Sequence, residues 1–105
     1  MPNVTRLPKP ANDRLLQLHI ELTWIKPAIW RRVAVPERIT LSQLHQVIQA
    51  VMGWSDTHLH EFEIAGESYG IPDPDWGPPV VSEQRKTLTK VLYGSKAFRY
   101  VYDFG

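Results

Sequence analysis

A single helical stripe of apolar residues, set among segments that alternate apolar and polar residues, constrains this chain more than any other feature. Leu, Ile and Val recur every three or four positions from Leu41 to Met52, which is the spacing of one buried helix face. Thr40 can accept from the backbone of Gln43 while the Gln43 side chain returns the bond, as in a capping box. Gly53 suits the left-handed residue that ends a helix. The sequence therefore predicts a helix over about residues 41–52.

Period-two patterns on both sides of this helix predict strands. Apolar residues occupy every second position from Leu16 to Leu22, and a β-branched and aromatic run from Ile29 to Val35 follows a turn at Lys26-Pro27, which together indicate a hairpin. The later elements are a strand at 58–65, its return at 68–71, a short helix at 88–92 that Thr87 can cap, and a strand at 98–104. We therefore expect an α+β fold: an antiparallel sheet built from an N-terminal β-hairpin, one main helix (about 41–52), a second hairpin, a short helix and a C-terminal strand.

The chain of 105 residues is long enough for one hydrophobic core and too short for two. Pro2, Pro8 and Pro10 stand in a segment of low apolar content, so residues 1–13 are expected to form a flexible arm and residues 14–105 a single domain. Proline-rich residues 72–79 predict a stiff projecting loop. Of the four tryptophans, Trp76 in this loop is expected to be exposed, and Trp24, Trp30 and Trp54 to lie in or near the core.

The composition indicates in which cellular compartment the protein is expected. There is no cysteine, so disulfides and thiolate metal sites are excluded and a reducing cytoplasm is the expected location. No apolar run reaches the roughly 20 residues of a membrane span, and the first residues lack the apolar core of a signal peptide. We therefore expect a cytoplasmic protein without a membrane partner.

Charge is distributed unevenly along the chain. Residues 1–50 hold seven Lys/Arg against three Asp/Glu, giving +4, and residues 51–105 hold five against eight, giving −3. Between Asp56 and Glu83 there is no Lys or Arg, and the acids of this stretch are Asp56, Glu61, Glu63, Glu67, Asp73, Asp75 and Glu83. A solvated face is the commonest reason for such a run. The run also disfavours nucleic acid, which requires a basic surface.

Histidines cluster just after the predicted helix. On a strand, His58 and His60 point the same way, so both imidazoles can approach one metal ion, with Asp56 or Asp103 supplying oxygen. A third imidazole could be that of His45, which lies on the predicted helix. It would join the other two only if the fold brings the helix next to the strand. The alternative is that these histidines bond backbone groups. A divalent metal held by His58, His60 and Asp103 is therefore one hypothesis, and no other cofactor is predicted.

Other functional signals are weaker. No phosphate-binding or dinucleotide-binding loop occurs, and Ser55 beside Asp56 suits a turn better than a catalytic triad. We therefore assign no catalytic residue and expect a binding protein rather than an enzyme. Arg31 and Arg32 follow an aromatic residue, Trp30, and with three further cations they suggest a basic patch for phosphate contacts: Arg14, Lys26 and Arg38. Adjacent strand residues face opposite ways, so internal ion pairs explain these cations more simply.

Several segments together resemble the plasmid pRiA4b ORF-3-like family. They are Ile25-Lys26-Pro27-Ala28-Ile29-Trp30-Arg31-Arg32, Val35-Pro36, Leu41 to His45, the run from Gly53 to Phe62, Tyr69-Gly70, and Tyr100 to Gly105. The resemblance spans about Leu15 to Gly105 and implies an α+β domain with a hairpin, a helix and a further antiparallel sheet. Members of the family continue past a Tyr-Asp-Phe-Gly segment, so the resemblance implies a C-terminus truncated at Gly105. It also implies an association with mobile elements.

The leading hypothesis is a small cytoplasmic binding or interaction domain whose ligand is an unknown small molecule or protein. The alternatives are a metal-dependent hydrolase or nuclease-like enzyme that uses His58, His60 and Asp103, and a nucleic-acid-binding protein that uses the basic first half. A homo-oligomer through the edge of the C-terminal strand is a further expectation. The candidate ligand-binding residues are polar or aromatic side chains near the helix C-terminus and the sheet: Trp30, Arg32, His45, Trp54, Asp56, His58, His60 and Asp103.

Overall fold

A computed structural model describes residues 14–75, 77 and 79–102 of the chain. The expected arm at residues 1–13, the side chain of Trp76 and Asp103 lie outside the described residues. The elements are β1 (Leu15–Glu21), β2 (Trp30–Pro36), α1 (Leu41–Met52), β3 (His60–Ile64), β4 (Glu67–Gly70), β5 (Val81–Ser82), α2 (Leu88–Leu92) and β6 (Arg99–Tyr102). Strands and helices in this order confirm the α+β fold class. No helix in this part of the chain is long and apolar enough to cross a membrane.

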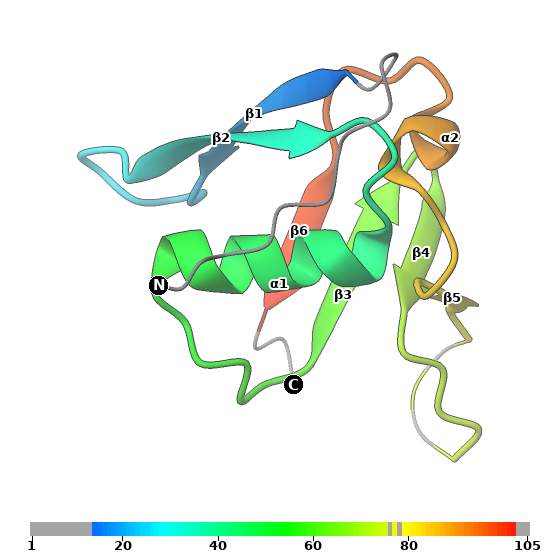
Figure 1. Ribbon diagram of the computed structural model, residues 1–105. Helices are drawn as coiled ribbons and strands as arrows, with labels where there is room; N and C mark the ends of the chain where they lie inside the picture. Colours follow the sequence, from blue (N-terminus) through cyan, green and yellow to red (C-terminus); the bar gives the residue numbers. More distant parts are fainter. Residues whose placement is uncertain (1–13, 76, 78, 103–105) are drawn as a thin grey trace, which may run out of the picture.

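The strands form two sheets, a hairpin and a further sheet, as the family resemblance implied. β1 and β2 pair antiparallel as a two-stranded ribbon, and the second sheet has the order β5-β4-β3-β6. Within it β4 and β5 run parallel, and the sequence analysis missed β5. A strand of two residues carries no periodicity, so no pattern could predict it. In Figure 1, α1 crosses in front of β3 and β6, and the ribbon lies above it.

The capping box of α1 is confirmed. The Thr40 hydroxyl accepts from the backbone of Gln43 at 3.1 Å, and the Gln43 side chain accepts from the backbone of Thr40 at 3.0 Å. Gly53 ends the helix in the left-handed region with φ 73°. The buried face contains the apolar residues Leu41, Leu44 and Ile48 and, unexpectedly, the polar pair His45 and Gln49. The apolar side of the helix therefore packs in the core. His45 and Gln49 form a polar strip beside it, which can make other contacts.

β3 is an inner strand of the second sheet, and its residues alternate between buried and partly buried. Phe62 and Ile64 join the core with the α1 stripe, with Val35 of β2 and with Leu88 of α2. The predicted start of this strand is wrong, because β3 begins at His60 rather than His58. Ala65 and Gly66 turn the chain into β4 with φ values of 50° and 81°, as a two-residue hairpin of this kind requires.

Two smaller predictions are also wrong. Trp24 is 98% exposed at the tip of the ribbon, and Trp30 is exposed on it, so of Trp24, Trp30 and Trp54 only Trp54 is partly buried against the core. Thr87 precedes α2 as expected but makes no side-chain capping bond. The start of α2 is held by the backbone instead, because the N–H of Leu88 donates to the carbonyl of Ile39 at 2.9 Å.

Candidate functional site

Two buried histidines stack face to face between α1 and β3. The ring centroids of His45 and His60 are 3.5 Å apart, and the ring planes differ by 13°. The side chains are only 4% and 5% exposed. The helix supplies His45 from its polar strip, and the strand supplies His60 as its first residue. Burial of two ionisable groups at this separation requires compensating partners.

Each imidazole of this pair bonds a carboxylate. Nε2 of His45 lies 2.8 Å from Oδ1 of Asp56, and Nε2 of His60 lies 2.7 Å from Oε1 of Glu83. Since a carboxylate accepts, each Nε2 donates its hydrogen. The two pairs differ in burial, because the Asp56 side chain is 46% exposed and that of Glu83 only 6%. One pair therefore meets solvent, whereas the other is enclosed.

Asp56 is held by the turn that follows α1. Its backbone is left-handed, with φ 55°, a region that Asp and Asn tolerate better than most residues. Its N–H donates to Oε1 of Gln49 at 2.7 Å. The hydrogen bond from His45 is the largest influence on its carboxyl group and lowers its pKa. Asp56 is therefore ionised at neutral pH and directed toward the helix.

Glu83 reaches His60 from the far edge of the sheet. It follows β5, and its N–H donates to the carbonyl of Gly70 at 3.0 Å. Gly70 itself lies close to β3, because a Cβ there would stand 3.4 Å from the carbonyl oxygen of His60. The short parallel strand β5, which was not predicted from the sequence, thus positions the carboxylate of Glu83 beside His60.

Tyr100 of β6 closes the network on the other side of His45. Its hydroxyl lies 2.6 Å from Nδ1 of His45 and accepts from Nε2 of Gln49 at 2.9 Å. Burial raises the pKa of Tyr100 to about 12, so the phenol keeps its proton. With the neutral imidazole donating through Nε2 to Asp56, Nδ1 is an acceptor for the Tyr100 hydroxyl. The hydrogen bonds therefore form a chain in which Gln49 donates to Tyr100, Tyr100 donates to His45, and His45 donates to Asp56.

The stacked histidines form the inner wall of a pocket of about 380 Å³, which we call the acidic pocket. Its carboxylates and imidazoles are Asp56, Glu61, Asp73, Glu83, His45, His58 and His60. None of the described lining residues is Lys or Arg. The acidic stretch of the sequence is thus partly gathered around one cavity, and carboxylates gathered in a cavity favour cations over anions. Leu59 and Ile71, both exposed, also line it.

Three of the candidate residues form what we call the His/Asp cluster. One potential ligand atom from each of His45, Asp56 and His60 lies within 4.8 Å of the others. Imidazole nitrogens and a carboxylate oxygen are common ligands of divalent transition metals. The structure therefore brings together part of the predicted site. This part includes His45, which no local sequence pattern could place beside His60.

The other candidate residues that the structure describes are not members of this cluster. His58 precedes β3 and is exposed, with its ring edge-on to Tyr102 at 5.4 Å. The face-sharing argument for His58 and His60 is therefore wrong, because His58 is not in the strand. Trp54 stacks on Tyr102 at 4.9 Å. Asp103, the third member of the predicted metal set, lies outside the described residues.

Trp30 and Arg32 belong to the outward face of the ribbon. Trp30 stacks on His19 at 4.9 Å, and the guanidinium carbon of Arg32 lies 5.8 Å from the Trp30 ring centroid. Neither residue lines the acidic pocket. Arg31 turns back to donate to the carbonyl of Trp30 at 2.8 Å. The candidate basic residues are all exposed, namely Arg14, Lys26, Arg31, Arg32 and Arg38.

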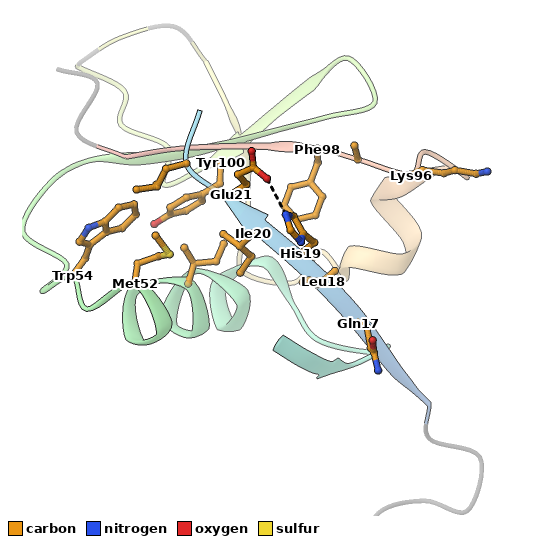
Figure 2. Close-up of a pocket in the computed structure, with 13 residues that line it drawn as sticks. Gln17, Leu18, His19, Ile20, Glu21, Met52, Trp54, Lys96, Phe98 and Tyr100 are labelled. Atoms are coloured by element: carbon orange, nitrogen blue, oxygen red, sulfur yellow. Dashed lines mark hydrogen bonds and ion pairs between the residues drawn. The ribbon is translucent and has the colours of Figure 1, made fainter. Parts of the chain in front are cut away.

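A second cavity, of about 440 Å³, lies between β1, α1 and β6. Figure 2 shows Ile20, Met52, Trp54 and Tyr100 around it. The figure also shows His19 bonded to Glu21 at its edge. Tyr100 links the two cavities, because it lines this one while its hydroxyl bonds His45, which lines the acidic pocket.

Sequence reasoning missed the three residues that support the cluster: Gln49, Glu83 and Tyr100. Gln49 lies one helical turn after His45, so helical spacing from a candidate site residue was a usable signal. Glu83 and Tyr100 are 23 and 55 residues from their histidine partners. Only the pairing of strands brings them close, and no local pattern in one sequence reports it.

The fold and this site define an α+β domain with a paired histidine–carboxylate centre in an acidic pocket. A family model described as plasmid pRiA4b ORF-3-like protein matches residues 14–105. The chain therefore belongs to the plasmid pRiA4b ORF-3-like family, which confirms the resemblance noted in the sequence.

Two relatives extend this comparison. An uncharacterised protein of Sinorhizobium fredii, y4hQ, is 41% identical over 93 residues, which cover 87% of this chain and 48% of the relative. The crystal structure of a protein of unknown function from Methanosarcina mazei, MM3350, matches with a TM-score of 0.78 and 40% identity over 89% of this chain and 55% of that one. The chain thus spans about half the length of these relatives.

Proposed function

We propose that this protein is a binding domain and that its ligand is a cation held in the acidic pocket. The observation that carries this proposal is the lining of the pocket, which combines four carboxylates and three imidazoles with no described Lys or Arg. A cavity lined by charges of one sign concentrates ligands of the opposite sign. The exposed side chains of Leu59 and Ile71 at the same pocket offer a surface for an apolar portion of the ligand.

Matched probes test the sign of the ligand charge. We expect hexylammonium or Zn²⁺ to shift the NMR amide resonances of pocket residues in the full chain, and hexanoate to leave them unchanged. Glu61→Gln combined with Asp73→Asn removes two pocket charges outside the His/Asp cluster and should weaken the binding of either cation. Glu63→Gln combined with Glu67→Gln removes two charges from residues that do not line the pocket and is the matched control. Binding of hexanoate in preference to both cations, or of none of the probes, would refute the proposal.

A metal-dependent hydrolase that uses the His/Asp cluster is the second candidate. The supporting observation is that the His/Asp cluster offers three ligands at the wall of an open pocket, as catalytic zinc sites do. The carboxylates of the pocket disfavour a phosphodiester and favour a neutral ester or amide substrate. Hydrolysis of p-nitrophenyl acetate by zinc-loaded protein, abolished in Asp56→Asn, would support this candidate. The same rate in wild type and variant would contradict it.

A further inference from the structure

We propose that the His/Asp cluster is a binding site for a divalent transition-metal ion, held by His45, Asp56 and His60. This inference rests on the proposed cationic ligand and names its chemical class. Two of the three ligands are buried imidazoles, and one atom of each residue lies within 4.8 Å of the others. Two nitrogens with one carboxylate oxygen suit zinc, cobalt or nickel, whereas calcium and magnesium prefer sites made of oxygen.

The hydrogen bonds determine which nitrogen each histidine offers. Nε2 of His60 donates to Glu83, so Nδ1 is the ligand atom of His60. Nδ1 of His45 bonds Tyr100, whereas its Nε2 bonds the proposed ligand Asp56. Nε2 is therefore the ligand atom of His45. The metal takes the place of the hydrogen that His45 now shares with Asp56.

Supporting residues of the kind that metal-binding histidines use are already present. The enclosed Glu83 accepts from the remote nitrogen of His60, which is the carboxylate–histidine–metal arrangement. Tyr100 serves His45 in the same way: when the metal takes Nε2, the imidazole hydrogen moves to Nδ1 and is donated to the phenol oxygen, and the phenol hydrogen turns away from His45. Gln49 already donates to that oxygen and holds the ring of Tyr100 in place.

Metal binding also changes the relation between the two rings. The imidazole lone pairs lie in the ring planes, and these planes are within 13° of parallel. The lone pairs of two stacked rings therefore point in parallel planes and do not converge on one ion. To bind the same ion, His45 and His60 must tilt relative to each other. Asp56 can follow this movement because its side chain is half exposed. We therefore expect the histidine ring protons to lose their mutual ring-current shifts when the metal binds.

The test is a titration of the full chain with Co²⁺, because its visible absorption reports ligand number and type. We expect about one ion per chain, with the intense bands of a low-coordinate site, competition by Zn²⁺, and weaker binding at acidic pH since protonated imidazoles do not bind metal. Asp56→Asn and His60→Gln should each weaken binding at least about tenfold. Glu83→Gln should weaken it roughly 10- to 100-fold through the orientation of His60.

Two histidine controls separate this site from general metal binding. His19→Gln changes an exposed histidine on the ribbon and should leave the titration unchanged. His58→Gln removes a pocket imidazole outside the His/Asp cluster and should weaken binding less than His60→Gln does; an equal loss would contradict the ligand assignment. Circular dichroism and urea unfolding establish that each variant is folded. Because Asp56 is half exposed, Asp56→Asn keeps the test decisive if His60→Gln unfolds.

The results also distinguish this inference from the proposed function. Stoichiometric Co²⁺ uptake that depends on Asp56 and His60 supports both. Binding of hexylammonium without Co²⁺ uptake, or Co²⁺ uptake unchanged by Asp56→Asn and His60→Gln, overturns the metal site but leaves standing the proposal that the acidic pocket binds a cation. Binding of neither cation overturns both.

Discussion

His45 and His60 stack with their ring centroids 3.5 Å apart, and each bonds its own carboxylate, Asp56 or Glu83. The two carboxylates hold the rings in place and orient their nitrogens. The site thus consists of two histidine–carboxylate pairs joined through their ring faces.

Substitutions of His60 and Glu83, the enclosed pair, should have strongly non-additive effects on the free energy of unfolding. Glu83→Ala leaves His60 buried without its acceptor and should lower the free energy of unfolding by about 3 kcal/mol. His60→Phe removes the group that needs this acceptor, so the double variant should lose less than the sum of the single losses, by about 1 to 3 kcal/mol. Urea unfolding of the four proteins measures this cycle. Strictly additive losses would show that the 2.7 Å contact contributes no coupling.

The exposed pair should have a smaller effect that depends on pH. The folded protein holds the pKa of Asp56 below its ordinary value, so ionised Asp56 stabilises the fold above about pH 4 and loses this effect as the pH falls through the lowered pKa. Asp56→Asn should therefore lower the free energy of unfolding by less than about 1 kcal/mol at pH 7, and by a smaller amount near pH 2. Asn tolerates the left-handed backbone at this position. A difference that grows toward acidic pH would contradict the direction of the shift.

The two tyrosines of β6 provide a matched comparison. Tyr100→Phe leaves buried His45 and Gln49 without the hydroxyl that they share, at a cost of about 1 to 3 kcal/mol. Tyr102→Phe removes an acceptor only from the exposed N–H of Thr57, which water can replace, and should cost less than about 1 kcal/mol. Thermal unfolding of both variants measures the difference. Equal losses would show that the buried network adds nothing beyond ring packing.

The ribbon should not bind nucleic acid. Arg31 and Arg32 are neighbours on β2 and therefore point to opposite faces. Arg32 already lies over the ring of Trp30, which limits both as contacts for phosphate or bases. We expect no mobility shift of single-stranded or duplex DNA with micromolar protein at low salt. A shift that weakens as salt is raised, and that Arg32→Ala reduces, would restore the nucleic-acid alternative.

The helix and the strands followed from the sequence because their signals are local. The capping residues Thr40 and Gln43, the end at Gly53 and the alternation within β3 depend on neighbours a few positions apart. The parallel strand β5 was missed because its two residues gain their structure from β4 rather than from their own pattern. Exposed Trp24 shows a second limit, because hydrophobicity alone does not determine burial at a hairpin tip.

The site could be predicted in its residue types but only partly in its members. His45, Asp56 and His60 were among the candidates, and the structure brings them together. His58 was misplaced because the two-residue repeat holds only inside a strand, and β3 begins after it. Glu83 looks like any acid of a charged stretch until the pairing of β5 with β4 buries it beside His60. The mobile-element association, the cytoplasmic location and an oligomer through the C-terminal strand stay predictions.

Anomalous diffraction from crystals of the full chain grown with Co²⁺ tests the central claim most directly. Data on both sides of the cobalt absorption edge locate the ion without reference to any assumed site. We expect one strong peak within about 2.3 Å of Nε2 of His45, Nδ1 of His60 and a carboxylate oxygen of Asp56. A peak at His19 or His58 instead, or no peak at the cluster at saturating cobalt, would contradict the claim.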